Sequence, residues 1–98
     1  MDTEIQDFGW ALRKLKQGKK VARIGWNGKG MFLFLLPAGE IPKTAIHDPK
    51  LKEVLENSGK DSFSALASIR MKTADDKILT GWLASQTDML ADDWEEVV

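Results

Sequence analysis

The chain has 98 residues, of which 43% are hydrophobic and 30% charged, and its formal net charge is −1. A chain of this length folds as one domain, because two separate cores would each be too small to be stable. The absence of cysteine excludes disulfides and thiolate metal sites, and the near-neutral charge argues against a general DNA-binding protein. Since a single small core is itself marginal, we expect a homo-oligomer.

The first residues are acidic where a secretory signal is basic, and no apolar segment of signal length follows them. The longest apolar run, Met31 to Pro37, is far shorter than the roughly 20 residues that cross a bilayer. We therefore expect a cytoplasmic protein without a membrane partner.

Near the N-terminus, apolar residues recur at helical spacing, at Ile5, Phe8, Leu12 and Leu15. Thr3 with Gln6 would form a capping box for this helix, and Asp7 is an alternative cap. Gly18 is a natural end for it.

Residues 21–24 and 31–36 are predicted strands, the second continuously apolar with two aromatics. Residues 25–30 between them contain three glycines and an Asn-Gly step, which predict a turn. The three segments predict a β-hairpin. Its second strand is expected to be central and buried on both faces, or buried on one face with a subunit contact on the other.

A variable insertion is expected at about residues 38–68. Within it, Asp48 and Pro49 mark a helix start, and Ser58-Gly59 marks the end of that helix. The stretch 60–67 is expected to be a loop or a second short turn of helix.

Residues 68–73 alternate with period two, 74–77 read as a polar turn, and 78–80 as a returning strand. Ser85 with Asp88 predicts a capped helical turn from which Met89, Leu90 and Ala91 pack inward. Residues 93–98 are expected to close the sheet as an edge strand. The order predicts an α+β fold, a small antiparallel sheet packed against an N-terminal helix and a short C-terminal helix.

The two signs of charge are separated along the chain. Residues 13–29 contain seven basic residues and no acidic one, and residues 84–98 contain five acidic residues and no basic one. Two solvated surfaces are one interpretation; a basic wall for a phosphate-bearing ligand, or a charge match between subunits, is the other.

Catalysis has little support in the sequence. The single histidine, His47, cannot build a nucleophilic triad or a common zinc site without cysteine or further histidines. The pairs Asp75-Asp76 and Asp92-Asp93 are candidate magnesium ligands, although adjacent acids in turns are usually solvated. We therefore expect a protein that is not an enzyme and has no cofactor or metal.

Ligand binding has better support. The segment 25–30 combines glycines that let a ligand approach the backbone, amides for a phosphate, the Trp26 ring for a base, and Lys29. It is neither a Walker loop nor a dinucleotide fingerprint, and an ordinary glycine-rich hairpin has the same composition. Arg70 and Lys72 are expected on one face of a strand. They could clamp phosphates there, or that face could simply be exposed to solvent.

Four groups of residues, in chain order, resemble one family of small phage proteins. They are Asp7-Phe8-Gly9 with Ala11, Leu12, Leu15, Lys16 and Gly18; Gly25-Trp26-Asn27-Gly28-Lys29-Gly30-Met31; Met71-Lys72-Thr73-Ala74-Asp75; and Trp82-Leu83-Ala84-Ser85-Gln86-Thr87-Asp88-Met89-Leu90-Ala91 with Asp93-Trp94. The chain resembles the first described type of phage Thoeris anti-defence protein, a family long catalogued as a domain of unknown function. The resemblance covers about residues 5–37 and 69–98, and it departs from the family pattern at Asp76 and Gly81, where members carry Gly and Pro.

The resemblance implies a sponge, a single ligand-sequestering domain over residues 1–98 that traps the cyclic ADP-ribose signal of bacterial Thoeris immunity. Some members also capture cyclic trinucleotides from CBASS immunity. It further implies dimers that hold the signal between protomers, and hexamers that create further sites. The expected ligand-binding residues are Arg23, Trp26, Asn27, Gly28, Met31, Phe32, Arg70, Lys72, Thr73, Trp82, Ser85, Gln86 and Asp88.

The implied roles are distinct. Aromatic faces would stack the adenine, whereas loop amides with Arg23, Arg70 and Lys72 would bind the pyrophosphate. The remaining polar side chains would bind ribose hydroxyls or the adenine edge. Two other functions compete with this one: a protein–protein module that inhibits a host enzyme, and a hydrolase or lyase that uses the paired acids with a metal.

Overall fold

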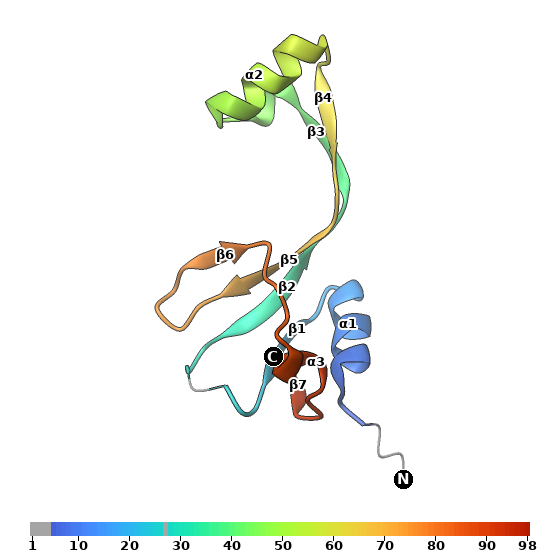
Figure 1. Cartoon of the computed structure of the whole chain (residues 1–98), viewed down its shortest axis with the longest axis vertical. Coiled ribbons are helices and arrows are strands. Elements are labelled where there is room, and N and C mark those ends of the chain that lie inside the picture. The colour runs from blue at the N-terminus through green and yellow to red at the C-terminus, as the bar shows by residue number, and fades with distance from the viewer. Residues whose placement is uncertain (1–4, 27) are drawn as a thin grey trace. The chain divides into compact units, whose positions relative to one another are not determined.

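The protein is described by a computed structural model that covers residues 5–26 and 28–98. The chain divides into two compact units: unit 1 comprises Met1–Leu36 and Ser68–Val98, and unit 2 comprises Pro37–Ala67 (Figure 1). Among the described residues, no helix combines the length and apolar character that a membrane span requires.

Unit 1 begins with helix α1 (Phe8–Lys16), which confirms the predicted N-terminal helix. The Asp7 carboxylate caps it by accepting the backbone N–H of Trp10 at 2.8 Å, and Gly18 follows its end at φ +84°. Of the two predicted caps, Asp7 is therefore the one used, and Thr3 lies outside the described residues.

The predicted place of Ile5 on the helical stripe is wrong. Ile5 precedes α1 and is 67% exposed. The reason is the next residue: Gln6 forms a parallel bridge with Asp93, and its carbonyl accepts the backbone N–H of Trp94 at 3.1 Å. Tertiary pairing thus holds this segment extended and delays the helix to Phe8.

The main sheet of unit 1 is antiparallel, with the order β6-β5-β2-β1-β7. Its strands are β1 (Lys20–Arg23), β2 (Phe32–Leu36), β5 (Ser68–Lys72), β6 (Ile78–Thr80) and β7 (Trp94–Val97). The predicted hairpin is confirmed as β1 and β2, with β2 in the centre, and β7 is the predicted edge strand. The α+β fold class is therefore confirmed.

One face of this sheet carries the core. Val21, Leu33, Met71 and Trp94 are buried on it and cluster with Trp10, Ala11 and Leu15 of α1. Val21 pairs with Leu33, and Leu33 with Met71, so alternation places these side chains together on the side that α1 covers (Figure 1). Removing this apolar surface from water is the main source of the fold's stability.

The opposite face is named the Phe face here and is defined by Lys20, Phe32, Phe34, Arg70 and Lys72. Phe34 pairs with Arg70, which pairs with Thr80; Phe32 pairs with Lys72. Directly paired residues share a face, so Arg70 and Lys72 lie on the same side, as predicted. Phe32 and Phe34 are partly buried there. Whether a subunit covers this face remains a prediction.

Helix α3 (Gln86–Met89) starts with the predicted capping box: Ser85 Oγ accepts the Asp88 N–H, and the Asp88 carboxylate accepts the Ser85 N–H. The prediction that Met89 and Leu90 pack inward is wrong, because these side chains are 43% and 77% exposed. A single helical turn presents few side chains to the interior. In α3 the inward-facing side chain is Asp88, and Ala91, after the helix, packs against the core.

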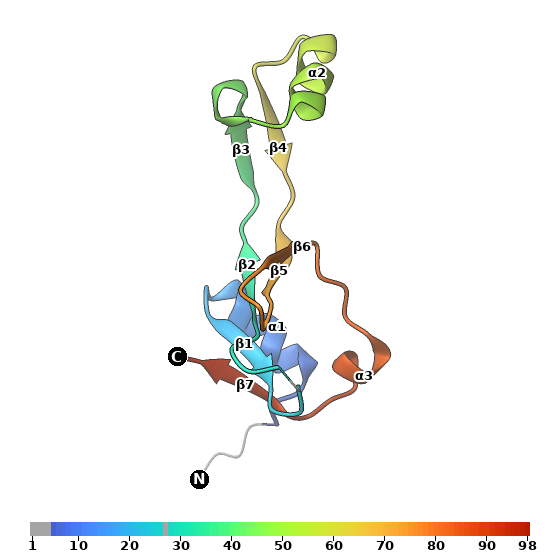
Figure 2. The same ribbon diagram turned by 90° about the vertical axis from the view of Figure 1, so that its left-hand side faces the viewer.

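Unit 2 contains β3 (Gly39–Pro42), a 3₁₀ turn η1 (Lys43–Ala45), α2 (Pro49–Ser58) and β4 (Ser62–Ala65) (Figure 2). As predicted, Asp48 caps α2, and Gly59 ends it in the left-handed conformation. The expected loop or helical turn at 60–67 is wrong: β4 pairs antiparallel with β3, and Phe63 lies opposite Ile41. Ile46 and Leu55 are the buried residues of this unit.

Candidate functional site

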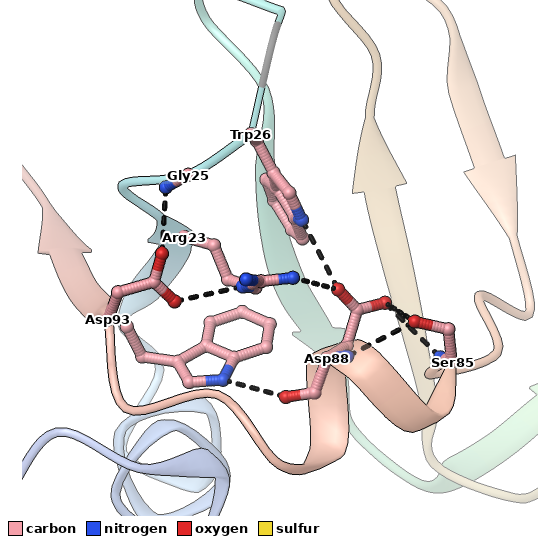
Figure 3. A network of polar contacts seen from close by, with 7 residues as sticks. Arg23, Gly25, Trp26, Ser85, Asp88 and Asp93 are labelled. Carbon is pink, nitrogen blue, oxygen red and sulfur yellow. Dashed lines mark hydrogen bonds and ion pairs between the residues drawn. The ribbon is translucent and has the colours of Figure 1, made fainter.

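A polar network joins three distant segments of unit 1, with Arg23 at its centre. The guanidinium of Arg23, at the end of β1, donates from Nη1 to Asp88 Oδ1 and from Nε to Asp93 Oδ1, each at 2.9 Å (Figure 3). The second oxygen of Asp93 accepts the backbone N–H of Gly25 at 2.8 Å. A Cβ at Gly25 would lie 2.9 Å from that oxygen, so glycine allows this contact. Asp93 thereby fixes Gly25, the first residue of the segment 25–30, which is called the glycine-rich loop below.

Asp88 is the most heavily bonded side chain of the network and is 9% exposed. Besides Arg23, its carboxylate accepts the Trp26 indole N–H at 3.3 Å and both the N–H and O–H of Ser85 (Figure 3). Its carbonyl accepts the indole N–H of Trp94 at 3.1 Å. One residue of α3 therefore holds the loop, the helix cap and the core tryptophan together.

The electrostatics of the network favour the charged forms. Burial by itself raises the pKa of Asp88, but hydrogen bonds from Arg23 and Ser85 outweigh it and leave that pKa below its ordinary value. The hydrogen bond from Arg23 lowers the pKa of Asp93 against a smaller effect of burial. Hydrogen bonds to Asp93 and then Asp88 raise the pKa of Arg23. All three groups are thus ionised together near neutral pH.

Three tryptophans lie beside this network. The Trp26 and Trp94 ring centroids are 5.4 Å apart, and Trp82 is 6.4 Å from each of them, all edge-to-face. Trp26 and Trp82 are partly buried against the core, and Trp94 is fully buried. The aromatic residues predicted to stack a base therefore also anchor the loop and the segment before α3.

A surface hollow of about 330 Å³ lies along β1, β7 and the glycine-rich loop. Four expected ligand-binding residues line it: Arg23, Trp26, Gly28 and Met31. The rest of the lining comes from Ala22, Ile24, Lys29, Gly30, Glu95 and Val97. At Gly28 a Cβ would lie 2.5 Å from Met31 Sδ and 2.8 Å from the Ala74 Cβ, so the loop packs this closely only with glycine.

Phe32 and Lys72 connect this loop to the Phe face. Lys72 Nζ donates to the Gly30 carbonyl at 3.0 Å, pairs with Asp76 at 2.7 Å, and lies 6.0 Å from the Phe32 ring centroid. The Lys20 ammonium lies 5.0 Å from the same ring. Phe32 is therefore flanked by two cations within cation–π distance.

The other expected ligand-binding residues lie in the polar network, on α3, in the turn before β6 or on the Phe face. Ser85, Trp82 and Asp88 belong to the network side, and Gln86 is exposed on α3. Thr73 lies in the turn before β6, where its hydroxyl bonds Asp75 and the Lys77 carbonyl. Arg70 lies further along the Phe face, and Asn27 lies outside the described residues.

Sequence reasoning missed Asp93 and Lys20 as parts of these arrangements. The segregation of charge was the available signal for Asp93. The structure pairs these segments within one chain: Arg23 with Asp88 and Asp93, and Lys14 with Glu96 at 3.6 Å. Neither interpretation of the charge pattern foresaw this intrachain pairing, because it joins residues about 70 positions apart.

Three of the four paired acids considered as metal ligands are engaged elsewhere. Thr73 and Lys77 bond Asp75 and lower its pKa, Asp76 pairs with Lys72, and Asp93 holds Arg23. Within residues 5–26 and 28–98, no group of three or more histidine, aspartate and glutamate side chains is placed to hold a metal ion.

A larger hollow, of about 590 Å³, lies in unit 2 and is lined by Glu40, Lys60, Asp61, Ser62, Phe63 and Ser64. The Glu40 carboxylate there already accepts hydrogen bonds from Ser62 and Ser64. None of the expected ligand-binding residues lines it. The hollow beside the glycine-rich loop is therefore the better candidate site, despite its smaller size.

Nearly the whole chain matches one protein family. Residues 6–97 match the model of the Thoeris anti-defense 2-like domain, so the chain belongs to that family, whose role is phage anti-defence. Among individual proteins, it is similar to one of Bacillus phage SP01 named Thoeris anti-defense 2. The two are 40% identical over 97 residues, and the match covers 92% of each chain. The resemblance to the Thoeris anti-defence proteins is thus confirmed, and the type that matches is that of Thoeris anti-defense 2.

Proposed function

We propose that the protein binds and sequesters cyclic ADP-ribose-type signals in the host cytoplasm and so prevents activation of Thoeris effectors. The observation that carries this proposal is the hollow beside the glycine-rich loop. A family with an anti-defence role supplies the context, and four of the ligand-binding residues that the resemblance to this family implies line this one concavity. Such clefts, with a few fixed polar groups, are where small ligands usually bind.

The chemistry of the lining suits a planar, anionic ligand. The Trp26 indole is fixed by its bond to Asp88 and offers a base-sized apolar surface, and base–aromatic stacking is worth about 1–3 kcal/mol. Arg23 uses Nε and Nη1 within the network, so its Nη2 is the edge left for a phosphate. Lys29 and the loop glycines add charge and closely approachable backbone.

Rigidity supports tight capture. A binding site that is already ordered loses little conformational entropy when the ligand arrives, which slows release. Here Asp88 and Asp93 hold the loop to α3 and β7 before any ligand binds. In this proposal, the network residues Asp88, Asp93 and Ser85 position the site, and they need not contact the signal.

The proposal includes a homodimer or larger assembly, up to a hexamer. At about 330 Å³, the hollow lies at the lower end of the roughly 300–1,000 Å³ range of ligand pockets, and it is open on one side. A second protomer that closes over it would bury the ligand and exclude water. The signal would be held unchanged, without catalysis.

A protein–protein inhibitor module is the second candidate, and one observation favours it. Leu83 and Leu90, on either side of α3, are 88% and 77% exposed, and Met89 within α3 is 43% exposed, so three large apolar side chains close together in the sequence face solvent. The metal-dependent hydrolase is less favoured, because three of the four acids it would use, Asp75, Asp76 and Asp93, are held by internal bonds.

Calorimetry, followed by release of the bound ligand through heat denaturation of the protein, distinguishes the three functions. Purified protein is titrated with a cyclic ADP-ribose isomer and, in a second arm, with a cyclic trinucleotide. The complex is then denatured, and the ligand is analysed by chromatography. A sponge binds stoichiometrically and returns the ligand intact. A hydrolase returns a cleaved product, and a protein-directed inhibitor shows no heat of binding with either ligand.

A further inference from the structure

The turn between β5 and β6 has an unusual backbone at Asp76. Among the described residues, Asp76 is the one residue other than glycine with a positive φ, at +64°. Few L-amino acids adopt this left-handed conformation, and aspartate is among those that tolerate it. The turn is closed around it, because the Thr73 carbonyl accepts the Asp76 N–H at 3.1 Å and the Thr73 hydroxyl accepts the Lys77 N–H at 2.9 Å. These bonds set the direction in which the Asp76 side chain leaves the backbone.

That side chain pairs with Lys72, at the end of β5. Asp76 Oδ1 lies 2.7 Å from Lys72 Nζ, and the same ammonium donates to the Gly30 carbonyl at 3.0 Å. An ammonium group carries more than one N–H donor, so it makes both contacts together. Lys72 therefore links the β5–β6 turn to the last residue of the glycine-rich loop.

Gly30 is suited to this contact. Its φ is +77°, and a Cβ there would lie 3.2 Å from Lys72 Nζ. A side chain at this position would be strained and would crowd the ammonium. At the other end of the loop, Asp93 accepts the Gly25 N–H at 2.8 Å. The glycine-rich loop is thus held at its first residue by one carboxylate and at its last residue by an ammonium.

We infer that Asp76 is a positioning residue of the candidate site, which holds Lys72 Nζ on the Gly30 carbonyl and so fixes the end of the glycine-rich loop. Ordering a long, flexible lysine side chain costs conformational entropy, and the second acceptor offsets that cost. Gly28, Lys29, Gly30 and Met31 line the hollow, whereas Asp76 does not. Asp76 therefore shapes the hollow through Lys72, without a contact of its own.

This assignment changes the role of Lys72. The resemblance implies that Lys72 binds pyrophosphate, but here its charge is offset by Asp76 and its ammonium is engaged with the loop. Lys72 then acts on a ligand through the position of Gly30. The Asp76 side chain is 83% exposed, and exposed ion pairs add little to global stability, so its effect is local to the loop. Only the consequence for ligand capture rests on the proposed function.

The test compares the full-length parent with Asp76→Gly, Lys72→Met and the variant that carries both. Glycine adopts the left-handed backbone without strain, so Asp76→Gly keeps the turn and removes the carboxylate. The ¹³C resonance of the Gly30 carbonyl, detected through the Met31 amide, reports the hydrogen bond from Lys72. It is expected to move in Asp76→Gly in the same direction as in Lys72→Met.

Trypsin cleavage after Lys29, which is exposed in the loop, reports how often the loop opens. We expect cleavage about twofold to fivefold faster in each single variant, the ratio that matches the contribution of an exposed ion pair. Because both substitutions break the same link, the double variant should be cleaved no faster than Lys72→Met. Cleavage after Lys50, in unit 2, is the internal reference and should stay constant.

Lys77→Gln is the matched control. It removes the other ion pair of the same turn, between Lys77 and Asp75 at 3.1 Å, and should leave the Gly30 resonance and the cleavage after Lys29 unchanged. An unmoved Gly30 resonance in Asp76→Gly would overturn the inference. So would faster cleavage on adding Asp76→Gly to Lys72→Met, because a residue that only stabilises the turn acts without Lys72.

Calorimetry with a cyclic ADP-ribose isomer separates this assignment from the proposed function. Asp76→Gly is expected to bind about twofold to fivefold more weakly than the parent, in proportion to the loss of loop order. A parent that binds no ligand, with the loop measurements as expected, refutes the sponge alone. A parent that binds the signal, with an unmoved Gly30 resonance in Asp76→Gly, refutes the positioning role alone.

Discussion

Asp88→Asn is the sharpest perturbation of the network, because it removes a charge and changes the shape of the side chain very little. The carboxylate accepts hydrogen bonds from Arg23, Trp26 and Ser85. An asparagine amide has one acceptor oxygen and presents N–H groups to donors on its other side. The variant therefore keeps some contacts, loses others, and leaves Arg23 with Asp93 as its remaining carboxylate.

The expected cost is about 1.5–3 kcal/mol, the usual worth of a hydrogen bond to a charged group. Because Asp88 is largely buried, we expect a cost in the upper part of this range. A larger loss of stability is not expected, because Arg23 keeps its ion pair with Asp93. For a domain of this size, about 1 kcal/mol moves Tm by roughly 4–8 °C. We therefore expect Tm to fall by roughly 6 °C or more.

Urea unfolding followed by tryptophan fluorescence at pH 7 and at pH 3 measures the effect. Asp92→Asn, at an exposed neighbouring acid, is the control and should change stability by less than about 0.5 kcal/mol. At pH 3, below the ordinary pKa of aspartate, Asp88 of the unfolded parent takes up a proton, so its charge stabilises the folded state less and the difference between parent and variant should shrink. A difference of the same size at both pH values would refute the assignment to charge.

The remaining predictions concern the core, the division into units and acid stability. Trp94→Ala should destabilise unit 1 by about 3–5 kcal/mol, because the ring is fully buried; a variant that melts like the parent would contradict this. Deleting residues 37–67 and joining Leu36 to Ser68 through Asn-Gly should leave unit 1 folded, since these two residues are directly paired; an unfolded circular dichroism spectrum would disprove it. Both network carboxylates have lowered pKa values in the folded state, so the unfolded chain takes up protons first as pH falls. Their stabilisation should be complete above about pH 5 and lost progressively below about pH 4, as a series of unfolding curves would show, whereas unchanged stability at pH 3 would count against the network.

Elements with local signals could be predicted from the sequence. Asp7 and Ser85 cap helices through their own side chains, and the alternation in 68–72 assigns Arg70 and Lys72 to one face. These features depend on residues no more than four positions apart. Propensity and periodicity are therefore sufficient to find them.

The strands of unit 2 lacked such signals. β3 contains Gly39 and Pro42, which are unusual in strands, and β4 alternates serine with Phe63 and Ala65. They pair because each satisfies the backbone groups of the other, and Ile41 packs opposite Phe63. Neither segment would be assigned as a strand by itself.

Sequence reasoning named three residues of the polar network but missed how they are arranged. Motif resemblance named Arg23, Trp26 and Asp88, but not that they bond to one another across more than 60 residues. It therefore gave each of them a ligand-binding role. The structure shows that these side chains use many of their hydrogen bonds to hold the glycine-rich loop in place. The spacing of residues along the chain does not predict this role.

Native mass spectrometry of the protein purified from cells with an active Thoeris system tests the central proposal most directly. The account predicts an oligomer that retains a small molecule with the mass of a cyclic ADP-ribose isomer, which is recovered unaltered once the protein is denatured. A ligand-free protein from the same signalling cells, alone or bound to a host enzyme, would contradict it.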